Sequence, residues 1–142
     1  MQSRHGTICL AGNLALNEQT LVSIVEADST LTHFDPLASH VAVAGSLICR
    51  YIIDGMTITE SVEKTLSIDF LEHLRAYANR EPSASGFAPT VLFSAIHFAK
   101  GPPEGLDHSF ALAGAENYCP PIVGALQSCI AMTNLSTPSR ST

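Results

Sequence analysis

The sequence predicts an all-α protein, and three observations support this prediction. Apolar residues recur every three or four positions in several stretches, capping residues stand where those stretches start, and glycine or proline follows their ends. No stretch alternates convincingly between polar and apolar residues with a period of two, and no segment repeats within the chain. We therefore expect a helical bundle without a sheet.

Capping residues define where the predicted helices begin. Asn17 is a suitable N-cap for the first helix, and Asp35 with Pro36 suits the N-cap and first turn of the second. Thr57 and Glu60 fit a capping box, in which each side chain accepts a hydrogen bond from the other residue's backbone N–H. The helices are predicted over residues 17–27, 36–53, 58–80, 88–99, 106–113 and 121–132.

The length and composition are those of one globular domain. Of the 142 residues, 46% are hydrophobic and only 14% are charged, so the chain can bury a sizeable core and is not of the disordered class. The last residues are polar and contain no apolar stripe. We expect a single helical domain over residues 1–133 and a frayed polar tail over residues 134–142.

The charge balance and hydropathy exclude several classes of partner. The chain has 13 acidic and seven basic residues, a net charge of −6, and its bases form no run. Nucleic acid and anionic membranes bind basic surfaces, so neither is an expected partner. Residues 41–49 form the longest apolar run, far shorter than the roughly 20 residues that span a bilayer. With no signal-peptide pattern at the start, the expected location is cytoplasmic.

The four cysteines show no C-x-x-C spacing: they are Cys9, Cys49, Cys119 and Cys129. This spacing, in a chain without a secretory signal, favours buried reduced thiols over disulfides or a zinc site. A thiol nucleophile formed by Cys119 and a histidine is the alternative, and the sequence alone leaves it open because it gives no distance between them.

Two loops place polar side chains at helix entrances. His33 precedes the helix predicted over residues 36–53, where it either meets an anionic ligand or helps to cap the helix. Glu116 is the only carboxylate of the loop AGAENYC, residues 113–119, where it either binds a hard cation through oxygen or belongs to a capping turn. Three further histidines are interpreted as surface or structural residues: His40, His73 and His97.

Two stretches together resemble the ADP-ribosylglycohydrolase family. STLTHFDPLASHVAVAGSLICRYIIDG, residues 29–55, is similar to the family segment in which a Ser/Thr-x-x-Thr-His-x-x-Pro start opens a long helix ending in glycine. FSAIHFAKGPPEGLDHSFALAGAENYCPPIVGAL, residues 93–126, is similar to its apolar helix, linker, short helix and glycine-led acidic loop. The order and spacing agree over residues 20–126. The resemblance implies a layered all-α bundle, of which this chain is the C-terminal portion.

The resemblance also implies which residues stand at the family's metal site. Where family members read GGDTDT, this chain reads GAENYC. Glu116 and Tyr118 then occupy the positions of two metal-binding aspartates, Asn117 and Cys119 occupy those of two threonines, and His33 lies near the ADP-ribose pocket. The family's N-terminal half supplies a GDALG-like stretch and a Thr-Asp-Asp cluster, which residues 1–30 do not contain.

The activity implied by the resemblance is metal-assisted hydrolysis of an ADP-ribosyl glycosidic bond, with magnesium as cofactor. Glu116 is the expected catalytic residue and metal ligand, and His33 and Asn117 are the expected substrate-binding residues. Because so many family ligands are replaced or missing, we expect little or no hydrolysis by this chain.

Two alternatives to an active hydrolase remain. One is a non-catalytic family member, either truncated, crystallin-like or ADP-ribose-binding, and the other is an unrelated helical interaction domain. Half of a layered fold leaves an apolar face uncovered. We therefore expect the chain either to associate with a second copy of itself or to need a complementary half that covers this face.

Overall fold

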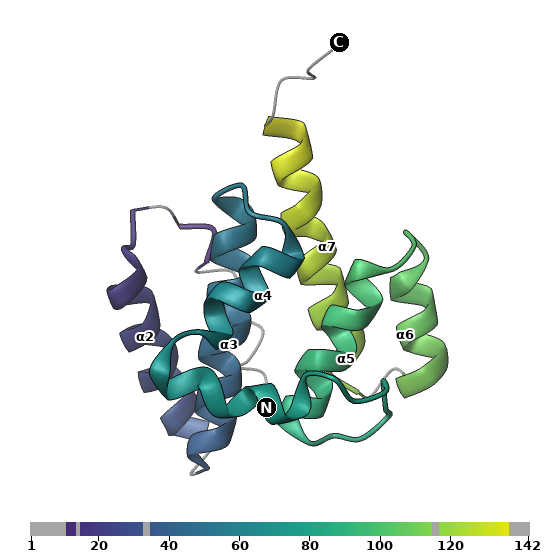
Figure 1. Ribbon diagram of the computed structural model, residues 1–142, viewed down its shortest axis with the longest axis horizontal. Coiled ribbons are helices and arrows are strands. Elements are labelled where there is room, and N and C mark those ends of the chain that lie inside the picture. The colour runs from purple at the N-terminus through teal and green to yellow at the C-terminus, as the bar shows by residue number, and fades with distance from the viewer. Residues whose placement is uncertain (1–10, 14, 33–34, 115–116, 137–142) are drawn as a thin grey trace.

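In the computed structural model, residues 11–13, 15–32, 35–114 and 117–136 are described, and every regular element within these ranges is helical (Figure 1). This confirms the all-α prediction. The elements, in chain order, are α2 (Glu18–Thr32), α3 (Pro36–Ile53), α4 (Ile58–Leu66), the 3-10 helix η1 (Asp69–Tyr77), α5 (Ala88–Lys100), α6 (Gly105–Ala113) and α7 (Cys119–Ser136).

Helix α3 is the centre of the bundle. It packs against α2, α4, α5 and α7, with α2 on one side and the α5–α6–α7 group on the other (Figure 1). Its Val43, Leu47 and Ile48 side chains are completely buried. Within the described ranges, α3 is the one helix long and apolar enough to cross a membrane, yet 72% of it is buried inside the structure. A core helix that other helices enclose has the same apolar composition as a helix that crosses a membrane.

The predicted caps are present. The Asp35 side chain accepts a hydrogen bond of 3.0 Å from the backbone N–H two residues ahead. Thr57 and Glu60 form the reciprocal capping box, with bonds of 3.1 and 3.2 Å. The Asn17 side chain accepts a 2.7 Å bond from the N–H three residues ahead, so it caps α2 as expected. Each bond satisfies a backbone donor that has no partner inside the helix.

The helix predicted over residues 58–80 is instead two helices. α4 ends at Leu66, the Ser67 hydroxyl donates to the Glu63 carbonyl, and Ile68 is extended with φ −76° and ψ 129°. The chain then continues as η1, in which Leu71 and Leu74 are buried. Two other helices are longer than predicted, since α2 runs to Thr32 and α7 covers Cys119–Ser136.

Candidate functional site

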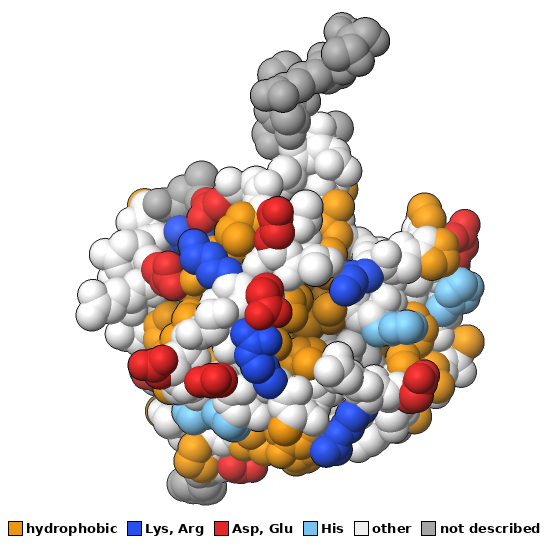
Figure 2. Space-filling view, in the orientation of Figure 1, with side chains coloured by type: hydrophobic (Ala, Val, Ile, Leu, Met, Phe, Trp, Pro, Cys, Tyr) orange, Lys and Arg blue, Asp and Glu red, His pale blue; other side chains and the backbone are white. Residues whose placement is uncertain are grey.

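A groove of about 910 Å³ lies between α4, η1 and α5. Its floor includes Leu66, Phe93 and Ile96, which are 2%, 7% and 6% exposed. Figure 2 shows hydrophobic side chains in a hollow near the centre of this face, with charged side chains around it. Small-molecule sites typically have volumes of about 300–1,000 Å³ and mainly apolar walls with a few polar groups. The groove therefore has the size of a ligand site, and its lining combines apolar side chains with polar and charged ones in similar numbers.

Basic side chains are concentrated along this groove. Arg75 from η1, Arg80 from the following loop and Lys100 from the end of α5 all line it, which makes three of the chain's seven Lys and Arg residues. Glu63 and Glu81 line it as well. In a protein with a net charge of −6, a region with more bases than acids is a local exception. It favours an anionic ligand over a cationic one.

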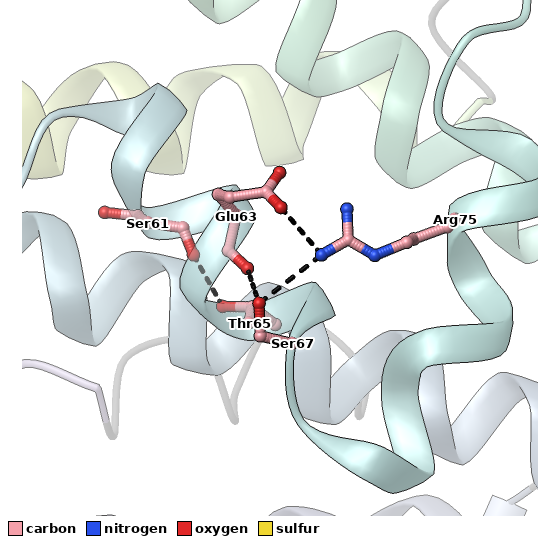
Figure 3. A network of polar contacts seen from close by, with 5 residues as sticks. All are labelled: Ser61, Glu63, Thr65, Ser67 and Arg75. Atoms are coloured by element: carbon pink, nitrogen blue, oxygen red, sulfur yellow. Dashed lines mark hydrogen bonds and ion pairs between the residues drawn. The ribbon is translucent and has the colours of Figure 1, made fainter.

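The Arg75 guanidinium connects two elements of the groove wall. It reaches from η1 to the end of α4, where Nη2 lies 2.7 Å from a Glu63 carboxylate oxygen and 3.4 Å from the Ser67 hydroxyl (Figure 3). The hydrogen bond from Arg75, together with its charge, lowers the pKa of Glu63. The Arg75 and Glu63 side chains are 40% and 67% exposed. Such exposed pairs contribute little to stability, so an anionic ligand can replace Glu63 as the partner of Arg75 at small cost.

The loop that closes the groove is held by two hydrogen bonds. The Ser83 N–H donates to the Ser94 hydroxyl of α5 at 3.1 Å, and the Asn117 side-chain amide donates to the Ala84 carbonyl at 3.0 Å. Residues 81 and 82, at the start of this loop, line the groove. Asn117 therefore holds the loop whose first residues line the groove. Its predicted contact with a substrate remains a prediction.

The other predicted site residues fall into two groups. His33 and Glu116 lie outside the described residues, so their predicted roles remain predictions. Tyr118 is half-buried against the core and Cys119 is completely buried. The Cys119 N–H donates to the Asn117 side-chain oxygen at 2.8 Å, which forms a turn at the start of α7. Within the described ranges, no group of three or more His, Cys, Asp and Glu side chains could hold a metal ion.

Cys119 is expected to react slowly with alkylating reagents in the folded protein. Burial raises the pKa of its thiol from 9.0 to about 11, which at pH 8 lowers the reactive thiolate fraction about a hundredfold. Mass spectrometry after timed iodoacetamide labelling of the native and the urea-unfolded chain measures the ratio of the two rates. Equal rates would show that Cys119 is accessible and would restore the thiol-nucleophile interpretation.

The sequence alone did not identify the basic residues of the groove, Arg75, Arg80 and Lys100, because none of them belongs to a motif. The available signal was their position, because three of the chain's seven Lys and Arg residues fall between residues 75 and 100. The chain matches no family model, no curated protein and no solved structure. The comparisons therefore neither support nor contradict the resemblance to ADP-ribosylglycohydrolases.

Proposed function

We propose that this protein binds an anionic ligand with an apolar portion in the groove between α4, η1 and α5, without hydrolysing it. In this proposal it is a non-catalytic, ADP-ribosylglycohydrolase-like protein, and ADP-ribose is the ligand that the resemblance suggests. The observation that carries the proposal is the concentration of Arg75, Arg80 and Lys100 along an apolar floor. Guanidinium groups bind phosphates through paired hydrogen bonds, and the buried floor offers an apolar surface for a base or similar ring.

The contacts of the acidic loop support binding without catalysis. A two-magnesium centre needs several hard oxygen ligands in near-octahedral geometry. Here the Cys119 thiol is soft and buried, Tyr118 packs against the core, and the Asn117 side chain is used in two hydrogen bonds that hold the loops. This donor set does not fit a binuclear magnesium centre. Glu116 is the one residue of the loop that we propose as a ligand for a single ion.

Calorimetric titration with ADP-ribose tests the binding proposal. We expect saturable binding that weakens at least tenfold in Arg80→Gln and in Lys100→Gln, because each variant removes one cation from the groove. Lys64→Gln is the matched control, since the Lys64 ammonium lies 4.4 Å from the centre of the Tyr51 ring and does not line the groove. Affinity that is equal in the groove variants and the wild type would contradict the proposed location.

An activity assay tests the absence of hydrolysis. We expect no release of ADP-ribose from ADP-ribosyl-arginine or ADP-ribosyl-serine, with or without magnesium. Two outcomes would overturn this part of the proposal: turnover that Glu116→Gln abolishes, or tight stoichiometric binding of two magnesium ions.

We also propose that the chain self-associates or binds a complementary half. Large apolar side chains are exposed on three helices, with Leu31 of α2 at 83%, Phe110 of α6 at 46% and Met132 of α7 at 55%. Figure 2 shows hydrophobic side chains at the edge of the face that α6 forms. Exposed apolar surface favours association. Light scattering over a range of concentrations measures self-association, and a strictly monomeric species at high concentration would contradict it.

A further inference from the structure

Two histidines that are 33 positions apart meet on the surface of the bundle. His40 Nδ1 of α3 lies 3.3 Å from His73 Nε2 of η1, and the ring centroids are 5.0 Å apart. His73 is exposed and His40 is half-buried. The Phe70 and His40 rings form an edge-to-face contact, with centroids 5.6 Å apart. The two nitrogens are therefore held close together between one half-buried and one exposed side chain.

Their separation matches that of two nitrogens on one tetrahedral metal ion. Zinc–imidazole bonds of about 2.0–2.1 Å at a tetrahedral angle place the two nitrogens about 3.3 Å apart. Occupation by a metal requires each ring to turn by roughly 35° so that both lone pairs point at the ion. A metal ion binds the lone pair of each facing nitrogen, so in the metal-bound state each neutral ring carries its proton on the outer nitrogen, which exchanges protons with water.

The surroundings of the pair suit a cation. The carboxylates of Glu26, on α2, and Asp35, at the start of α3, are close enough to act electrostatically on His40. Within the part of the chain that the structure describes, no third His, Cys, Asp or Glu side chain joins the pair, so water completes the coordination. Burial and the neighbouring His73 lower the pKa of His40, which favours the neutral ring that metals bind.

We propose that His40 and His73 form a two-imidazole site for a divalent transition-metal ion such as zinc. A bound ion links η1 to α3, two elements that pack against each other and that both contact α4. Imidazole nitrogen suits zinc, nickel and copper, whereas magnesium prefers oxygen. This site is therefore separate from the magnesium chemistry suggested by the resemblance.

Calorimetric titration with zinc chloride at pH 7, in a buffer that does not chelate metals, tests the proposal. We expect the wild type to bind a zinc ion at this site. His73→Asn and His40→Asn should each lose that ion or bind it at least tenfold more weakly. His73→Cys should retain the site, because a thiolate also binds zinc. His97→Asn removes an exposed histidine of α5 and is the matched control, with unchanged binding expected.

A second readout separates ligation from a loss of folding. Cobalt(II) should give the visible absorption of a tetrahedral site in the wild type and in His73→Cys, and lose it in His73→Asn. Because His73 is exposed, His73→Asn should keep the helical circular dichroism spectrum of the wild type. Zinc affinity and stoichiometry that are unchanged in His73→Asn, or reduced equally in His97→Asn, would overturn the proposal.

Discussion

Replacing Arg50 by methionine is expected to lower the free energy of unfolding by about 3–5 kcal/mol. Arg50 lies on α3 and is only 7% exposed. Its guanidinium donates three hydrogen bonds to the backbone carbonyls of Ala11, Asn13 and Leu16, at 2.9, 2.9 and 2.7 Å. Methionine fills a similar volume but donates nothing, so all three bonds from the guanidinium are lost, and the Asn13 carbonyl keeps only its bond from the Leu16 N–H.

Arg50→Lys is the matched variant for this prediction. Lysine keeps the positive charge, but a single ammonium does not present donors in the planar fork that reaches three separate carbonyls. We expect a loss of stability smaller than that of Arg50→Met. Arg75→Met, which removes an exposed arginine, should have little effect. Urea denaturation measures the free energy of unfolding of all three variants. A value for Arg50→Met within experimental error of the wild type would show that the bonds to Ala11, Asn13 and Leu16 do not stabilise the fold.

Gly105→Ala is expected to destabilise the protein by about 3 kcal/mol, because the added methyl group overpacks the contact between α5 and α6. A Cβ atom on Gly105 would lie 2.2 Å from the Phe98 carbonyl oxygen and 3.0 Å from its carbon. These are backbone atoms of α5, so no side-chain rotation relieves the clash, and the two helices must separate. Glycine is needed here for the close approach of two backbones.

Gly124→Ala provides the opposite control. Gly124 lies in α7, and a Cβ atom there would meet nothing within 4 Å. Alanine should stabilise that helix by about 0.5–1 kcal/mol, since it loses less conformational freedom on folding than glycine does. Thermal unfolding of the two variants therefore should shift in opposite directions. If the Gly105→Ala protein were as stable as the wild type, the backbones of α5 and α6 would not approach each other closely at Gly105 and Phe98.

The acidic loop shows how far the sequence could predict the candidate site. The sequence identified a polar loop before α7 and interpreted its residues as ligands by resemblance, but it could not give the direction of each side chain. In the fold, Cys119 is in the core and Asn117 contacts Ala84, a residue 33 positions earlier. Such contacts depend on how separate helices pack, which no local pattern encodes. For His33 and Glu116, the sequence-based predictions stand untested.

The sequence by itself determined the helical class and the starts of α2, α3 and α4, because a capping bond joins residues two or three positions apart. Only the tertiary structure decided where the predicted 58–80 helix breaks, since burying Leu71 and Leu74 against the bundle requires η1 to leave the axis of α4. It also decided the groove and the His40–His73 pair, whose residues come from different elements. The start of a helix is marked by capping residues that are close along the chain, whereas a site assembled from several helices depends on how their apolar faces pack together.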